Sequence, residues 1–306
     1  MPRDSLGAHY NADAVPDPTP HIHRDALHAL RGWFAAFESA AVALSGGVDS
    51  GLLAKVARDA LGDRAVAVIG VSPSLPRREA EAAVRLAESV GIRHVLVEPG
   101  EHRDPRYAAN PVNRCYFCKE ALYGLLAARA RTEDWAVVVD GTNSSDLDDD
   151  RPGRAAAAEA GVRSPLVELN IDKAMVRELA RALQLPVWDK PAAACLASRV
   201  PHGTAVTVEL LRQIEAAEDV LHALGFRDVR VRHHGDTARI ELPPDDMPAA
   251  VDHHATIVRG LRAAGYRHVT LDLAGRGGAE RAQTEELVQL TTMQSPGGAG
   301  GDGSAE

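Results

Sequence analysis

The chain has 306 residues, of which 45% are hydrophobic and 25% charged, and its formal net charge is −9. These values are those of an ordinary globular protein that is long enough for one large domain or two smaller ones. The excess of acidic residues disfavours nucleic acid as a partner, because phosphate backbones repel an acidic surface. The sequence has no run of eighteen apolar residues and no apolar N-terminal leader. We therefore expect a cytoplasmic protein with no membrane partner.

Short apolar runs alternate with helical patterns along the first two thirds of the chain. The sequence predicts four strands, at 41–44, 65–69, 94–97 and 135–139. It predicts helices between and after them, at 50–61, 77–90, 119–129 and 175–183. Apolar runs that are buried on both faces and separated by helices indicate an α/β fold with a doubly wound parallel sheet.

A smaller α+β region is predicted beyond residue 200. Its expected helices and strands follow in the order 208–224, 229–232, 238–242, 248–264 and 269–273, with His233-His234-Gly235-Asp236 joining the first two strands. Four segments result: a disordered tail at 1–20, a nucleotide-binding domain at 21–200, the α+β domain at 201–283, and a disordered Gly-rich tail at 284–306.

The segment Ser45-Gly46-Gly47-Val48-Asp49-Ser50 lies between the first predicted strand and its helix. Two glycines let backbone N–H groups approach an anion, and the helix N-terminus adds a favourable dipole. Ser45 and Ser50 can add hydroxyl donors, and Asp49 can cap the helix or help to hold Mg²⁺. No Gly-Lys-Ser/Thr and no third glycine follow, so this is neither a Walker loop nor a dinucleotide fingerprint. A bare Gly-Gly also fits a tight turn, but the whole hexapeptide resembles the loop of the N-type ATP pyrophosphatases (PP-loop enzymes). Those enzymes cleave ATP between its α and β phosphates.

The three cysteines are Cys115, Cys118 and Cys195, too few for a disulfide framework. No histidine lies at zinc spacing beside the Cys-x-x-Cys, and a thioredoxin-like context is absent. Three thiolates without a fourth protein ligand suit a [4Fe-4S] cluster with one open iron, which could hold an extra sulfide. Spacing alone leaves buried apolar thiols as an open alternative.

Two further patterns point to ligand binding. Arg230 and Arg232 alternate on one predicted strand and so point the same way, an arrangement suited to a substrate phosphate. A solvated strand face is the alternative for this pair. Asp140-Gly141-Thr142-Asn143 ends a buried strand on the expected ligand side of the sheet, where a simple turn is the alternative.

A set of motifs in a fixed order carries a family resemblance over about residues 25–275. The motifs are Asn113-Arg114-Cys115-Tyr116-Phe117-Cys118-Lys119, Asp140-Gly141-Thr142-Asn143, Arg151-Pro152-Gly153, Gly161-Val162-Arg163-Ser164-Pro165-Leu166, Lys190-Pro191, Cys195-Leu196-Ala197-Ser198-Arg199 and Val229-Arg230-Val231-Arg232-His233-His234. Together they resemble the LarE family, the ATP-dependent sulfur transferases of nickel-pincer nucleotide cofactor synthesis. The resemblance implies adenylation of a carboxylate of pyridinium-3,5-biscarboxylic acid mononucleotide with release of pyrophosphate. Replacement of oxygen by sulfur then gives a thiocarboxylate.

The resemblance also implies cofactors and site residues. Some members have only the cysteine that matches Cys195 and sacrifice its sulfur, whereas others have all three and depend on a cluster; this chain resembles the second type. The implied cofactors are ATP, Mg²⁺ and a [4Fe-4S] cluster, and the implied assembly is a homo-oligomer served by an unidentified sulfide donor. The implied roles are catalysis and cluster ligation by Cys115, Cys118 and Cys195; ATP and pyrophosphate binding by Ser45, Gly46, Gly47, Asp49, Ser50, Thr142 and Asn143; substrate binding by Arg199, Arg230 and Arg232; and a divalent metal at Glu218 and Glu241. The region at 201–283 is then expected to bind substrate or to support oligomerisation.

Three other functions compete with this one. Cluster-bearing tRNA thiolases share the loop and the Cys-x-x-Cys but would be expected to show a basic face. An amidating synthase of the NAD or GMP type would use ammonia, and the cysteines would then have no purpose. A non-catalytic nucleotide-binding or iron–sulfur carrier would bind ATP without splitting it.

Overall fold

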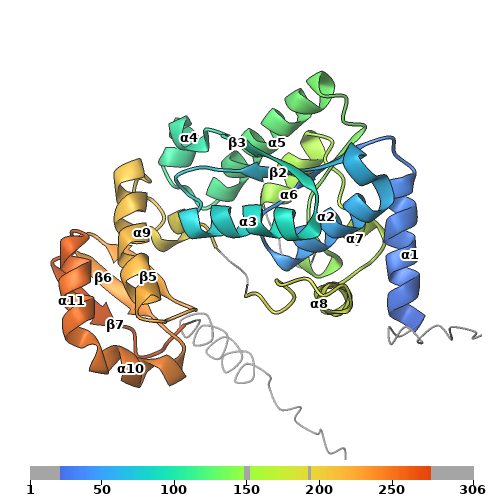
Figure 1. Ribbon diagram of the computed structural model, residues 1–306. Coiled ribbons are helices and arrows are strands. Elements are labelled where there is room, and N and C mark those ends of the chain that lie inside the picture. The colour runs from blue at the N-terminus through green and yellow to red at the C-terminus, as the bar shows by residue number, and fades with distance from the viewer. Residues whose placement is uncertain (1–20, 148–151, 192–193, 277–306) are drawn as a thin grey trace, which may run out of the picture.

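Residues 21–147, 152–191 and 194–276 are described by the computed structural model (Figure 1). The tails expected at 1–20 and 284–306 lie outside these residues. The first sheet is parallel, with strand order β3-β2-β1-β4. Its strands are β1 (Ala40–Ala43), β2 (Ala65–Gly70), β3 (Arg93–Val97) and β4 (Val137–Val139). Within the described ranges, no helix is long and apolar enough to cross a membrane.

Helices cover both faces of this sheet, because successive strand residues point to opposite sides. One face packs against α1 (His21–Ala35), α2 (Val48–Leu61), α3 (Arg77–Val90) and α8 (Lys173–Ala182). The other packs against α5 (Arg114–Thr132) and α6 (Pro152–Glu159). This arrangement confirms the predicted doubly wound α/β fold.

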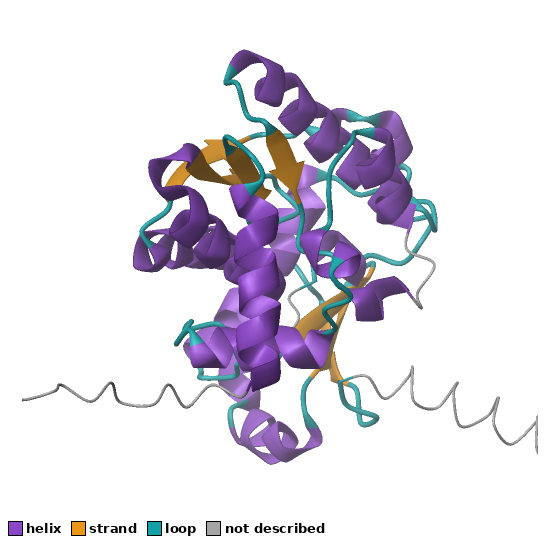
Figure 2. Ribbon diagram, turned by 90° about the vertical axis from the view of Figure 1, so that its right-hand side faces the viewer, coloured by secondary structure: helices purple, strands orange, loops and turns teal. Residues whose placement is uncertain are grey.

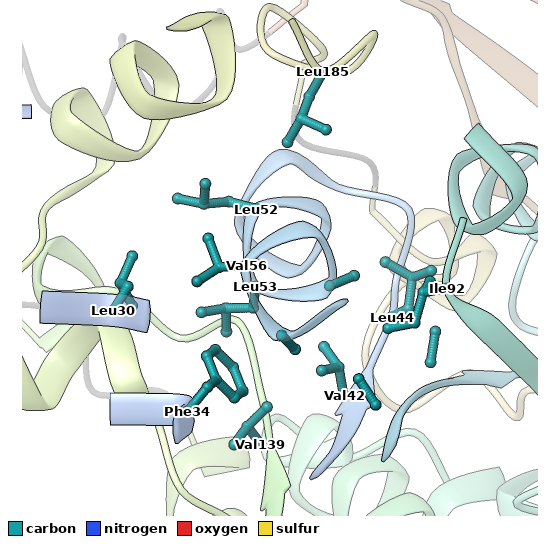
Figure 3. Packing of buried hydrophobic residues seen from close by; sticks show 14 of the residues in the cluster. Leu30, Phe34, Val42, Leu44, Leu52, Leu53, Val56, Ile92, Val139 and Leu185 are labelled. Carbon is teal, nitrogen blue, oxygen red and sulfur yellow. The ribbon is translucent and has the colours of Figure 1, made fainter. Parts of the chain in front are cut away.

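The centre of the first face is α2. Leu52, Leu53 and Val56 are fully buried there, between α1 and the strands (Figure 3). Burial of each such side chain contributes about 1.5–3 kcal/mol. The packing therefore holds the N-terminus of α2 firmly at the carboxyl end of β1.

A second sheet has the order β5-β6-β7, with β5 antiparallel and β7 parallel to β6. Its strands are β5 (Arg230–His234), β6 (Thr237–Glu241) and β7 (His268–Leu271), and they pack with α9 (Val208–Ala223), α10 (Met247–Asp252) and α11 (His254–Ala263). Figure 2 shows the two sheets in separate parts of the molecule.

A small apolar cluster joins the two parts. It brings Tyr107 of α4 (Pro105–Ala108) and Leu196 of the short helix η4 (Leu196–Arg199) against Leu211 and Ile214 of α9. The remaining short elements are α7 (Pro165–Glu168), η1 (Gly62–Arg64), η2 (Glu101–Arg103), η3 (Ser144–Leu147) and η5 (Pro244–Asp246).

Three sequence predictions about elements were wrong in detail. The helix expected at 119–129 begins at Arg114, so the Cys-x-x-Cys lies within α5 rather than before it. The expected His233-His234 connection belongs to β5, and only Gly235-Asp236 form the turn, with Gly235 at φ 65°. The helix expected at 248–264 is divided at His253, where no glycine or proline in the sequence marks the break.

Candidate active site

The glycine-rich loop connects the end of β1 to α2. Gly46 has φ 77°, and a Cβ there would lie 3.1 Å from Ala83 Cβ, so the loop needs glycine at this position. Gly47 is the N-cap of α2 and supplies no side-chain cap. The first N–H groups of α2 are consequently left for an anion, which the helix dipole also favours.

The two serines of the loop lie against each other. Ser45 Oγ and Ser50 Oγ are 3.1 Å apart, and Ser50 Oγ donates to Gly47 O at 3.3 Å. Ser50 also accepts from Ser45 N at 3.2 Å. The hydroxyls therefore line the same concave loop as the glycine N–H groups.

The end of β4 closes the loop from the side, because β1 and β4 are neighbours. A Cβ on Gly141 would lie 2.8 Å from Ser50 N, so only glycine allows the two backbones to approach this closely. Asn143 Nδ2 donates to Asp49 Oδ1 at 3.1 Å. The sequence motif at 140–143 and the loop thus form one site at the carboxyl edge of the sheet.

Asp140 organises the residues that follow β4. Its carboxylate accepts hydrogen bonds from Thr142 Oγ1 at 2.8 Å, Ser164 Oγ at 2.7 Å and Tyr123 Oη at 2.8 Å. Tyr123 is buried, and burial together with Asp140 raises its pKa to about 12. Because an ionised carboxylate can only accept, the Thr142 hydroxyl donates its hydrogen to Asp140, and its oxygen can accept a hydrogen bond from a ligand.

Two lysines that the sequence analysis did not assign also lie at the loop. Lys173 Nζ donates to Asp49 Oδ2 at 2.5 Å, and Lys190 Nζ donates to Gly46 O at 3.0 Å and Glu79 Oε2 at 2.8 Å. Lys173 begins a helix capped by Asp172, and nothing local marks it as a ligand residue. For Lys190, the Lys190-Pro191 motif was the sequence signal that could have identified it as a residue of the site.

The cysteines come from two segments of the chain. Cys115 is exposed in the first turn of α5, while Cys118 and Cys195 are partly buried against Tyr107 and Phe117. Burial raises the pKa of the Cys118 thiol to about 12, and the charges of Glu101 and Cys195 add to the rise. In the described part of the chain, no group of three or more His, Cys, Asp or Glu side chains lies close enough to hold a metal ion.

A buried polar contact ties the Cys195 segment to α5. Arg114 Nη1 donates to Asn110 Oδ1 and to Ala197 O, the latter at 3.0 Å. Asn110, at φ 55°, donates in turn to Pro201 O and Thr204 O, at 2.8 and 2.9 Å. Asn110 and Arg114 are at most 4% exposed, so this contact is shielded from water.

Arg199 and Glu218 form an ion pair that is almost fully buried. Arg199 Nε and Nη2 donate to the two Glu218 oxygens at 2.8 and 3.1 Å, and Nη1 donates to Ala194 O and Cys195 O at 2.9 and 3.1 Å. Glu218 also accepts from Val231 N at 3.0 Å. Arg199 thus holds the backbone beside Cys195, and α9 holds Arg199.

The two arginines of β5 differ in their surroundings. Arg232 donates to Glu241 Oε1 at 3.0 Å and to Ser198 O at 2.7 Å, and Arg239 also donates to Glu241. Among the described residues Arg230 has no ion pair. Burial lowers its pKa, as do the charges of neighbouring arginines, foremost Arg276. Glu218 and Glu241, the two carboxylates that were predicted to bind a divalent metal, both accept hydrogen bonds from arginines in the structure. A metal bound by these two carboxylates stays a prediction.

A cavity of about 220 Å³ lies where β5 meets α3 and the segment after α8. Two acidic side chains, Glu79 and Asp228, line it. Six basic side chains line it as well: Arg78, Lys190, Arg199, Arg227, Arg230 and Arg276. Because Lys190 also contacts Gly46, the cavity lies beside the glycine-rich loop, and its excess of basic side chains suits an anionic ligand.

Comparisons with known proteins give a matching family model and several similar proteins. A family model described as NAD synthase matches residues 33–105, the part that contains the loop. An uncharacterised protein of Synechocystis sp. is 48% identical over 251 residues, which are 81% of this chain and 94% of that protein. The pyridinium-3,5-bisthiocarboxylic acid mononucleotide synthase of Lactiplantibacillus plantarum is 38% identical over 253 residues, 82% of this chain and 92% of that protein. An uncharacterised protein of Methanocaldococcus jannaschii is 31% identical over 164 residues, 54% of this chain and 64% of that protein.

Proposed function

The chain belongs to the LarE family of ATP-dependent sulfur transferases, and from this membership we propose that it acts on pyridinium-3,5-biscarboxylic acid mononucleotide. It adenylates a carboxylate of this substrate, releases pyrophosphate and converts the activated carboxyl group to a thiocarboxylate for nickel-pincer cofactor synthesis. The observation that carries the proposal is the contact between Gly141 and the N-terminus of α2, which unites the glycine loop and the end of β4 in one nucleotide site.

The first step requires the pyrophosphate to be bound as it leaves. We assign its binding to the loop residues Ser45, Gly46, Gly47 and Ser50 and to the uncapped N–H groups of α2, which stabilise developing negative charge. The bond between the α and β phosphates breaks as a substrate carboxylate oxygen bonds to the α phosphorus. Asp49 would hold Mg²⁺, with Asn143 and Lys173 fixing its carboxylate.

The nucleotide and the substrate would lie on adjacent walls of the site. Thr142, held by Asp140, would contact the nucleotide. Arg230, which has no ion pair within the described ranges, would bind the substrate phosphate in the basic cavity, while Arg232 and Arg199 shape its wall. Adenylation makes the carboxyl oxygen part of a good leaving group, AMP, so that a sulfur nucleophile can displace it.

We propose that Cys115, Cys118 and Cys195 ligate a [4Fe-4S] cluster that carries that sulfur. Three thiols are the soft ligands that iron–sulfur clusters use, and Cys118 and Cys195 pack against one apolar cluster. In the described structure the three do not form a group close enough to hold a metal ion, so Cys115 would have to move toward the other two to bind the cluster. A [4Fe-4S] cluster would supply an iron-held sulfide as the nucleophile when bound. The protein itself orients Cys195 through Arg199 and limits water at Cys118 by burial.

The domain division follows from the same proposal. Residues 21–200 would form the PP-loop domain that activates the substrate, and residues 201–283 the domain that grips it and supports a homo-oligomer. The apolar cluster around Tyr107 would hold the two domains in a fixed position relative to each other.

The test is turnover of anaerobically purified protein with ATP and the pyridinium dicarboxylate mononucleotide. We expect pyrophosphate release that depends on this substrate and a thiocarboxylate product by mass spectrometry. More than one sulfur transferred per chain, with iron and sulfide present, supports the cluster. A single turnover that leaves dehydroalanine at position 195 overturns the cluster. Formation of an amide when ammonia is supplied, without a thiocarboxylate, overturns the sulfur transfer.

A further inference from the structure

The basic cavity holds more positive charge than the neighbouring carboxylates neutralise. Four of its six basic side chains lie 3.9 Å or less from a carboxylate of the described residues: Arg78, Lys190, Arg199 and Arg276. The carboxylates that they contact are also four in number: Glu79, Glu218, Asp219 and Asp228. Because these charges balance, the excess positive charge of the cavity belongs to the other two cations, Arg227 and Arg230.

Arg227 and Arg230 lie at the start of the second sheet without a carboxylate partner in the described part of the chain. Arg230 is the first residue of β5 and is partly buried, and Arg227 is exposed three residues before it. Burial and the neighbouring arginines lower the pKa of Arg230, so its charged form lacks compensation. A partly buried cation of this kind is stabilised when an anion binds beside it.

Arg232 is in a different position, although it alternates with Arg230 on the same strand. Its guanidinium donates to Glu241 Oε1 at 3.0 Å and to Ser198 O at 2.7 Å. It is not among the side chains that line the cavity, whereas Arg227 is. Arg232 therefore supports the wall from behind, and Arg227 is the second arginine that is available to a ligand.

We propose that Arg227, together with Arg230, binds the phosphate group of the substrate and thereby makes the protein select the mononucleotide over the riboside that lacks this phosphate. The inference rests on the proposed function and deepens it by naming a residue that determines substrate specificity. A phosphate monoester carries a charge of about −1.5 to −2 at pH 7, which the two uncompensated arginines match. Both arginines line one cavity of about 220 Å³, and a guanidinium can bind a phosphate through two parallel hydrogen bonds.

The experiment measures the phosphate preference, defined as the ratio of the dissociation constants for the riboside and the mononucleotide. Both ligands are titrated calorimetrically into the wild type and Arg227→Met. We expect Arg227→Met to lower the preference about tenfold or more through weaker binding of the mononucleotide, with binding of the riboside unchanged. Arg227→Lys keeps the charge but not the planar fork, so it should lose less than Arg227→Met.

The matched control is Arg262→Met, which removes an exposed arginine of α11 that does not line the cavity. It should keep the preference of the wild type. The proposal is overturned if Arg227→Met keeps that preference as well, or if it weakens binding of both ligands equally. A wild type that binds the two ligands with equal affinity overturns it too.

Two further measurements separate this proposal from the proposed function. The same variants are titrated with ribose 5-phosphate, a phosphate monoester without the pyridinium ring, and thiocarboxylate formation by the wild type is followed in parallel. Ribose 5-phosphate binding that depends on Arg227, without thiocarboxylate formation, refutes the proposed function and supports the phosphate site. Thiocarboxylate formation with an unchanged preference in Arg227→Met refutes the role of Arg227 alone.

Discussion

Loss of the Glu218 carboxylate is expected to destabilise the segment that carries Cys195. The Arg199 and Glu218 side chains are 4% and 1% exposed, and two hydrogen bonds join them. Glu218→Gln leaves the Arg199 charge buried without a counter-charge, and breaking a buried pair in this way costs about 3–5 kcal/mol. At about 2–4 °C per kcal/mol, Tm should fall by roughly 6–20 °C.

A double-mutant cycle tests the origin of that loss. Calorimetry of the wild type, Glu218→Gln, Arg199→Met and the double variant gives the coupling energy, which should exceed about 1 kcal/mol if the charges stabilise each other. Additive effects would refute the reasoning. Glu215→Gln on the same helix is the control, because its partner Arg77 is 81% exposed and such pairs contribute about 0–1 kcal/mol. A chelator that lowers the Tm of the wild type but not that of Glu218→Gln would instead indicate a divalent metal at Glu218.

Four further outcomes are expected. Gly141→Ala should raise the KM for ATP, measured by pyrophosphate release, at least about tenfold, because the added methyl group meets the backbone of α2, which cannot yield. Gly124→Ala is the control, since a Cβ at that position has no neighbouring atom within 4 Å. Lys173→Met should lower kcat/KM for pyrophosphate release by about 10–100-fold in the same assay, because a charge that fixes Asp49 is lost. Arg230→Met should raise the KM of the mononucleotide about tenfold or more, and an unchanged KM would place the substrate phosphate elsewhere. In the metal-free protein, the rate of Cys118 alkylation, followed by peptide mapping, should rise about tenfold per pH unit from pH 7 to 9. Burial raises the pKa of this thiol to about 12, so its thiolate fraction increases throughout that range. A rate that reaches a plateau below pH 9 would contradict the buried position of Cys118.

Short-range patterns accounted for the strands and for most of the helices around them. The runs at 65–69 and 94–97 and the helical spacing at 77–90 correspond closely to β2, β3 and α3, because burial on both sheet faces requires continuous apolar runs. The histidine pair was assigned to a turn, since its polarity hides strand pairing with β6. The break at His253 leaves no local signal, since neither a glycine nor a proline stands there.

The sequence by itself determined the glycine-rich loop, because a strand, two glycines and a helix N-terminus are neighbours along the chain. It also determined that three thiols are available. Only the tertiary structure decided which charges meet: Lys173 lies 124 residues from Asp49, and Arg199 is neutralised by Glu218 while Arg230 faces a basic cavity. Sequence pattern specifies which face of an element is apolar, but the pairing of long charged side chains depends on how distant elements pack.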